Sequence, residues 1–229
     1  MTARQLGTTM GALFIALIGF SSLVFATPTG TSISVNFGTD TAGVSGAAGL
    51  ASTVNWSNLS GASGGPVSVN VDAAGTTAPS TATISWNSSG TGSAFANNTA
   101  APGPDRDLML DFLESGNTVN ISGLDSFFTD NQYAVAVYTN GETAGGSGAI
   151  IAQTVSQIQN GVASPGTFNG TFVPGASFLT FTGFKEPDIT IRFDVPINGL
   201  ELVSVPEPTT CFLLGLGLAA VAGLAGRRR

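Results

Sequence analysis

Ile189-Thr190-Ile191-Arg192-Phe193-Asp194-Val195 is the stretch that decides the fold. Its apolar side chains stand at every second position, and polar side chains stand between them. An alternation with a period of two places one kind of side chain on each face of an extended strand. The stretch therefore predicts a β-strand with one face against a core and the other towards water.

Other segments of the chain predict strands for the same reason. Four of them alternate in the same way: Ile33 to Phe37, Val67 to Val71, Val119 to Ile121 and Tyr133 to Val137. Six more are extended by composition: 82–86, 108–113, 150–155, 167–173, 177–184 and 200–203. Gly, Pro, Asn and Asp separate these segments at intervals that suit turns, so about ten to twelve short strands are expected. No amphipathic helix is expected between residues 27 and 205.

This pattern predicts an all-β fold, namely a two-sheet antiparallel sandwich of the jelly-roll type. A sheet that closes on itself is the alternative. Segments rich in small residues are expected to form loops, at 42–52, 73–80, 90–105 and 141–148. The part of the chain between its two apolar ends is long enough for one domain with its own core.

The first 26 residues have the features of a secretory signal peptide. Arg4 supplies a positive charge, Leu6 to Phe25 is apolar, and Val24-Phe25-Ala26 places small residues where signal peptidase cuts. We expect cleavage after Ala26 and a mature chain that begins at Thr27. A retained N-terminal membrane helix is the alternative.

The C-terminal end is a second apolar segment with a basic terminus. An uncharged run from Cys211 to Gly226 precedes Arg227, Arg228 and Arg229. As a helix the run is about 24 Å long, slightly short of a hydrocarbon core about 30 Å thick. The arginines favour the cytoplasmic side of a membrane. Residues 206–229 are therefore predicted to be a tail with a marginal transmembrane helix at 211–226, and residues 27–205 a body on the opposite side.

The tail resembles the PEP-CTERM sorting tag, because Pro206-Glu207-Pro208, an apolar run and terminal arginines follow in that order. This tag is found on exported proteins of bacteria that make exopolysaccharide. The resemblance implies recognition by an exosortase, a membrane-embedded cysteine transpeptidase, and removal of the tail. It also implies a transient anchor in the inner membrane, followed by a place on the cell surface or in the extracellular matrix. A plain C-terminal anchor helix is the alternative.

Composition excludes several classes of function. Charged residues make up 9% of the chain, whose formal net charge is −7. Between residues 27 and 205 the basic side chains are Arg106, Lys185 and Arg192, too few to attract nucleic acid. The chain has no histidine, and its single cysteine, Cys211, lies in the tail. A serine–histidine system and a thiol nucleophile in the body are therefore excluded, and no cofactor is expected.

Acidic residues gather at Asp105, Asp107, Asp111 and Glu114. Carboxylates in such a cluster can bind calcium, so Asp105, Asp107 and Asp111 are candidate ligands for Ca²⁺. Two of these acids could instead form the carboxylate pair of a glycoside hydrolase. The remaining interpretation is a solvated strand entry in which Arg106 pairs with its neighbours.

Aromatic side chains of the body are candidates for contact with a sugar, because aromatic faces stack on the apolar faces of pyranose rings. They also dominate the cores of β-sandwiches, and a core position is the alternative for each. Tyr138 is expected to be the exposed one, because Asn140 and Glu142 follow it in a loop. The predicted ligand-binding set is Tyr138, Asn140, Glu142 and Trp56.

The body carries a second resemblance, to uncharacterised exported β-sandwich proteins with the same tag. Four short segments carry it: Val35-Asn36-Phe37-Gly38, Asn55 to Leu59, Tyr133 to Tyr138 and Pro196 to Leu202. Those proteins look like galactose-binding-like or malectin-like sandwiches, in which loops at one end often hold a sugar. The resemblance implies a sandwich and suggests a carbohydrate ligand.

Two functions are compatible with these observations. The first is a non-catalytic extracellular matrix or cell-surface protein that binds carbohydrate such as exopolysaccharide. Its expected partners are signal peptidase and exosortase during export, the membrane through the C-terminal helix before processing, and polysaccharide, but not nucleic acid. The second is a carbohydrate-active enzyme of the glycoside hydrolase type, which needs two carboxyl groups about 5 to 9.5 Å apart in a cleft.

Overall fold

The computed structural model describes residues 31–38, 43–73, 76–124, 128, 132–140, 146–152, 158–164 and 166–205. Most of these residues belong to β-strands, and a short helix, α1 (Pro104–Leu108), interrupts them. The strands before the helix are β1 (Ser32–Phe37), β2 (Trp56–Leu59), β3 (Ser63–Ala73), β4 (Thr76–Asn87) and β5 (Thr91–Ser93). Those after it are β6 (Asp111–Leu113), β7 (Asn117–Ser122), β8 (Gln132–Tyr138), β9 (Gly146–Ala152), β10 (Ile158–Ala163), β11 (Phe178–Phe184), β12 (Ile189–Phe193) and β13 (Gly199–Val205).

Eleven strands form one sheet, in the order β10-β9-β12-β7-β4-β3-β1-β13-β8-β11, with β2 paired to β1. Neighbours in this order are antiparallel, whereas β2 runs parallel to β1. Strands β5 and β6 make a separate two-stranded sheet. The register of β3 against β4 shifts at two places, and this is where the large sheet bends over on itself. The predicted all-β fold is confirmed, and its two layers are halves of one continuous sheet.

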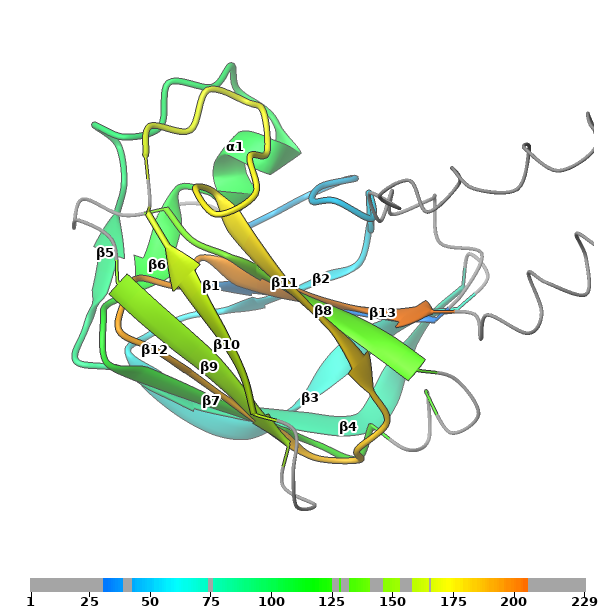
Figure 1. The fold of residues 1–229 in the computed structure, drawn as a ribbon. Helices are drawn as coiled ribbons and strands as arrows, with labels where there is room; N and C mark the ends of the chain where they lie inside the picture. The colour runs from blue at the N-terminus through cyan, green and yellow to red at the C-terminus, as the bar shows by residue number, and fades with distance from the viewer. Residues whose placement is uncertain are drawn as a thin grey trace, which may run out of the picture.

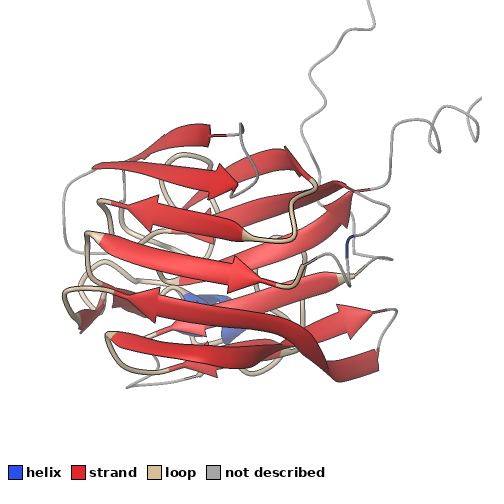
Figure 2. Cartoon of the chain, turned by 90° about the horizontal axis from the view of Figure 1, so that it is seen from below, coloured by secondary structure: helices blue, strands red, loops and turns tan. Residues whose placement is uncertain are grey.

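Figure 1 shows the two layers, which we name by what lies outside them. The covered layer consists of β1, β13, β8 and β11, with α1 and long loops above it. The open layer consists of β4, β7, β12, β9 and β10. Figure 2 views the molecule from the side of the open layer, and α1 lies behind the strands there.

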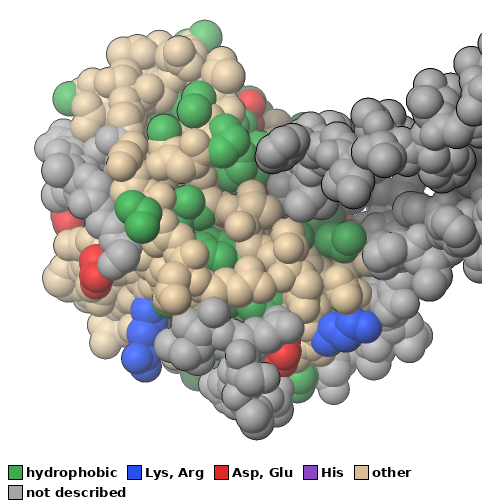
Figure 3. All heavy atoms as spheres, in the orientation of Figure 1, with side chains coloured by type: hydrophobic (Ala, Val, Ile, Leu, Met, Phe, Trp, Pro, Cys, Tyr) green, Lys and Arg blue, Asp and Glu red, His purple; other side chains and the backbone are tan. Residues whose placement is uncertain are grey.

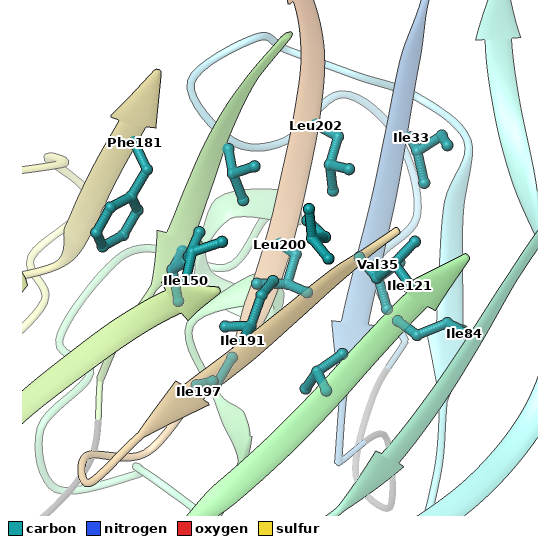
Figure 4. Packing of buried hydrophobic residues seen from close by; sticks show 14 of the residues in the cluster. Ile33, Val35, Ile84, Ile121, Ile150, Phe181, Ile191, Ile197, Leu200 and Leu202 are labelled. Atoms are coloured by element: carbon teal, nitrogen blue, oxygen red, sulfur yellow. The ribbon is translucent and has the colours of Figure 1, made fainter. Parts of the chain in front are cut away.

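The main core lies between the two layers and is built from the alternating apolar positions of the strands. Ile84, Ile121, Ile150 and Ile191 from the open layer meet Leu200, Leu202 and Val35 from the covered layer (Figure 4). Ring contacts also cross between the layers, and the centroids of Phe181 and Phe193 lie 6.2 Å apart. Burying a side chain of this size stabilises the fold by about 1.5–3 kcal/mol, so this core is the main source of stability.

The first and last strands of the sheet order, β10 and β11, meet along a seam. The side-chain amide of Gln159 on β10 donates to the carbonyl of Thr182 on β11 at 2.6 Å. The same amide accepts the backbone N–H of Thr182 at 3.2 Å. The Gln159 side chain therefore takes the place of a neighbouring strand, and it satisfies backbone groups that an edge strand leaves unpaired.

A second core lies on the outer face of the covered layer. Val135 and Val137 of β8 point into the main core, while Ala136 and Tyr138 point to the opposite side. There they pack against side chains of segment 43–55, of α1 and of segment 166–177, including Val44, Leu108, Phe168 and Phe172. The strands β1, β13 and β8 are consequently buried on both faces.

The structure corrects two sequence expectations near α1. No helix was expected in the body, but Pro104 starts one whose first turn carries Asp105 and Asp107. Proline is favoured at the start of a helix, and acidic side chains there stabilise the helix dipole. A helix of five residues is too short to show a periodicity. The expected extended run 108–113 is strand only from Asp111 onward.

Other boundaries also differ from expectation, and β5 and the start of β9 lie in the expected loops 90–105 and 141–148. Residues 167–173 form no strand; they are part of a loop whose Phe168 and Phe172 pack on the outer face of the covered layer. Residues 76–80, expected in a loop, continue β4 because they pair with β3 in a long hairpin. Strand β10 was not anticipated, since Ile158 to Ala163 lacks a regular alternation of apolar residues.

The described residues begin at Thr31 and end at Val205. The predicted signal peptide, residues 1–26, and the predicted tail, residues 206–229, both lie outside that part of the chain. Among the residues that are described, none belongs to a helix of the length and apolar character that crossing a membrane requires.

We predict that Gln159→Ala opens the seam between β10 and β11. It removes two hydrogen bonds in which the amide takes part, so the unfolding free energy should fall by about 1 kcal/mol. Hydrogen exchange at the Thr182 amide should become faster. Asn160→Ala is the matched control. The Asn160 side chain, next along β10, is exposed, so this variant should leave the unfolding free energy and the exchange of the Thr182 amide unchanged. Unaltered exchange at Thr182 in Gln159→Ala would contradict this role.

Candidate functional site

The predicted ligand-binding residues are not on the surface. Tyr138 is 0% exposed, Asn140 is 0% exposed and Trp56 is 6% exposed. The expectation that Tyr138 is exposed is wrong, because segment 43–55 covers its face of β8. Glu142 lies outside the described residues. Buried side chains cannot stack on a sugar at the surface, so this set does not form an open binding site.

Tyr138 belongs instead to a buried polar group centred on Glu201 of β13. The Tyr138 hydroxyl donates to one carboxylate oxygen of Glu201, and Thr53 Oγ1 donates to the other at 2.8 Å. The backbone N–H of Ala51 also donates to Glu201, at 3.2 Å. Ser34 of β1 lies 2.7 Å from Thr53 Oγ1. Glu201, between Leu200 and Leu202 in the sequence, therefore lies on the outer face of the covered layer, which is also buried.

This group holds segment 46–53 against the covered layer. The N–H of Leu50 donates to the Tyr138 hydroxyl at 2.7 Å, and the N–H of Gly49 donates to Asp105 Oδ1 at 2.9 Å. Gly49 has φ of +80°, and a Cβ atom there would lie 2.6 Å from Glu201 Oε1. Only glycine satisfies both conditions, so the segment can approach the carboxylate closely.

Burial changes the acid–base behaviour of both central residues. Desolvation raises the pKa of Glu201 above its ordinary value of 4.5, and the hydrogen bonds from Tyr138, Thr53 and Ala51 oppose the shift. Desolvation also raises the pKa of Tyr138 well above 10.0, and the neighbouring Glu201 carboxylate adds to that effect. Tyr138 therefore stays a hydrogen-bond donor at every physiological pH.

The candidate calcium ligands are directed to separate partners. Asp105 accepts from Gly49, Asp107 lies 3.8 Å from Arg106, and the buried Asp111 accepts from Ser93 Oγ at 2.6 Å. Within the described ranges no three or more His, Cys, Asp or Glu side chains are grouped so that they could hold a metal ion. The structure thus does not bring Asp105, Asp107 and Asp111 together.

The open layer presents a different surface, which no loop of the described chain covers in Figure 2. One row of side chains crosses five strands on its outer face, because each residue is the register partner of the next. The row is Asn87, Thr118, Arg192, Ala149 and Asn160. Apart from Ala149 its side chains are polar, and Arg192 is the charged one. The described surface in Figure 3 is likewise mostly uncharged.

A trough on this face is the candidate site. It has a volume of about 380 Å³ and follows β9 between β10 and β12. Its lining residues are Gly148, Ala149, Asn160, Gly161, Val162, Arg192 and Asp194. Sequence analysis assigned Arg192 and Asp194 to the wet face of their strand, but the pairing of β9 and β10 beside them could not be read from alternation.

Comparison with known proteins bears on the tail. The family model of the PEP-CTERM protein-sorting motif matches residues 204–229, which confirms the predicted sorting tag. Such a tag implies an exported protein that exosortase processes at the membrane. No curated protein and no solved structure matches the chain. The likeness of the body to galactose-binding-like or malectin-like sandwiches stays a prediction.

We predict that the stability of the protein depends on pH through Glu201. Its pKa is higher in the folded than in the unfolded chain, so its contribution is fully present below about pH 4.5 and is lost as the pH rises through the folded pKa. Glu201→Gln cannot ionise, so its free energy of urea unfolding should fall less between about pH 4 and pH 8 than that of the wild type.

Tyr138→Phe is the companion variant for this measurement. It removes the hydroxyl that stabilises the Glu201 carboxylate, so the pKa of Glu201 should rise further and the loss of stability with pH should be steeper. Parallel curves for the wild type, Glu201→Gln and Tyr138→Phe would show that Glu201 does not control the pH dependence.

Proposed function

We propose that this chain is a non-catalytic protein of the cell surface or extracellular matrix whose body binds carbohydrate, such as the exopolysaccharide around the cell. The sorting tag at residues 204–229 supports the destination, because a tag read by exosortase belongs to an exported protein. The observation that carries the binding role is the outer face of the open layer, whose row of paired residues is mostly polar and which holds the β9 trough.

The composition of this face suits a polyhydroxylated ligand. Amides and hydroxyls both donate and accept hydrogen bonds, as sugar hydroxyls do. Asn87 and Asn160 are exposed, and Thr118 and Asn120 are half-buried on the same face. Thr190 is already held by a hydrogen bond of 2.8 Å to Asn120, which keeps part of the face ordered before any ligand arrives. An ordered polar face loses little conformational entropy on binding.

The alternative function, a glycoside hydrolase, needs two carboxyl groups on either side of a cleft. The carboxylate of Glu201 is enclosed by Tyr138, Thr53 and Ala51 beneath segment 46–53. Asp111 is also 0% exposed and is bonded to Ser93. The β9 trough has one acid among its lining residues, Asp194. These positions favour the binding role over the enzyme.

The binding role predicts that the secreted protein is retained by polysaccharides. Labelled protein applied to a glycan array should bind one or more oligosaccharides, because the polar face can satisfy their hydroxyls. Overnight incubation with those same oligosaccharides should release no reducing sugar. Failure to bind any glycan on the array would contradict the binding role, and release of reducing ends would favour the hydrolase.

The sorting role predicts a defined mature form. Mass spectrometry of the secreted protein should give a chain that begins near Thr27 and lacks the terminal arginines. Glu207→Ala alters the centre of the Pro206-Glu207-Pro208 motif, so this variant should keep its tail and stay with the membrane fraction. A secreted wild type that still carries Arg229 would contradict processing at the tag.

A further inference from the structure

The floor of the β9 trough is set by packing inside the protein. Gly148 pairs with Phe193, and a Cβ atom on Gly148 would lie 2.2 Å from the Phe193 ring. A Cβ atom on Gly161 would lie 2.9 Å from Leu179 Cδ1. A side chain on Gly148 would displace the buried Phe193 ring, whereas one on Gly161 would press on the end of the Leu179 side chain. The side-chain positions of both glycines point into the core, and the outward position of β9 between Asn160 and Arg192 is the small Ala149, so the floor of the trough is low.

The walls of the trough come from the strands on either side. Asn160 and Val162 stand on β10, while Arg192 and Asp194 belong to β12 and the residue after it. Strands β10 and β12 are two strand spacings apart, or about 9.6 Å. The side chains of both walls narrow this backbone spacing, so the trough takes at most one sugar ring across its width, and its length runs along β9.

The chemistry of the walls fits a ring with hydroxyls at its edge and C–H groups on its faces. Arg192 donates, Asp194 accepts and Asn160 does both. Val162 is 72% exposed, and with Ala149 it offers an apolar surface to the ring face. A few directed polar groups around an apolar floor are the usual composition of a small-molecule site.

The charges of the walls point to a neutral sugar. Arg192 would attract a carboxylate on the ligand, but Asp194, two residues along the same edge of the trough, would repel it. The two charges together favour a ligand that has no net charge and presents hydroxyls to both. Binding through such contacts depends little on ionic strength.

We propose that the β9 trough is the subsite for one neutral sugar unit of a polysaccharide chain that lies along β9. The site deepens the carbohydrate-binding role proposed above and rests on it. Arg192 and Asn160 form hydrogen bonds to the ring from opposite walls, and Ala149 forms the floor on which the ring lies.

The test uses the secreted protein and the neutral and uronate-containing glycans of the same array. Arg192→Ala and Ala149→Phe should each weaken binding of a neutral oligosaccharide by about tenfold or more, because one removes a charged donor and the other fills the trough. Lys185→Ala removes a cation that does not line the trough, so this variant should bind like the wild type. Thermal unfolding of each variant checks that it is folded. The side chain at position 149 points outward from the core, so Ala149→Phe should fold.

Each outcome decides a different claim. Glycan binding that persists in both trough variants would overturn the subsite and leave the carbohydrate-binding role intact. Preference for uronate-containing glycans, weakened by added salt, would overturn the neutral class of ligand. No glycan binding by the wild type would overturn the carbohydrate-binding role itself, and the subsite with it.

Discussion

Burial of the covered layer on both faces is the constraint on which the rest of the structure depends. One face of β1, β13 and β8 closes the main core. The other face carries Tyr138, which packs against Trp56 of β2, and neither aromatic side chain can be left in water without cost. Segment 43–55, α1 and segment 166–177 provide the cover. Glu201 binds the first of these segments through Thr53 and Ala51, so a buried carboxylate decides where the loop lies.

The same constraint explains the division of the molecule into a closed and an accessible side. Loops and the helix gather over the covered layer, and the open layer keeps a bare outer face (Figures 1 and 2). A sheet face that no loop covers must present polar side chains to water. On this face most of these side chains are amides and hydroxyls, and few are charged. This is the face that we propose for the polysaccharide, while the sorting motif lies in the tail at 204–229.

The alternation of apolar and polar residues predicts the strands well where one face of the strand is buried and the other is exposed to water. Ile189 to Phe193 is the clearest case, with Arg192 exposed and Ile191 buried. Period two does not distinguish a face that is wet from one that a loop covers, and for this reason Tyr138 was misplaced. Glu201 was overlooked for the same reason, since nothing local shows that a strand is covered on both sides.

The candidate site was only half readable from the sequence. Arg192 and Asp194 are outward positions of an alternating segment, so the sequence predicts them. Asn160 and Gly161 belong to β10, which lacks the alternation that would predict a strand. That β9 lies between β10 and β12 is a long-range pairing, and local patterns do not contain it. The sorting motif of the tail could be predicted from the sequence, because three features follow one another within a short stretch.

The central claim is that ligands reach the open layer while the covered layer serves as scaffold. Hydrogen–deuterium exchange of the secreted protein, with and without a bound oligosaccharide, tests it most directly. We expect added protection in peptides of β9, β10 and β12 and no change in segments 43–55 and 166–177. Protection confined to those two segments would contradict the claim, because it would place the ligand on the covered side.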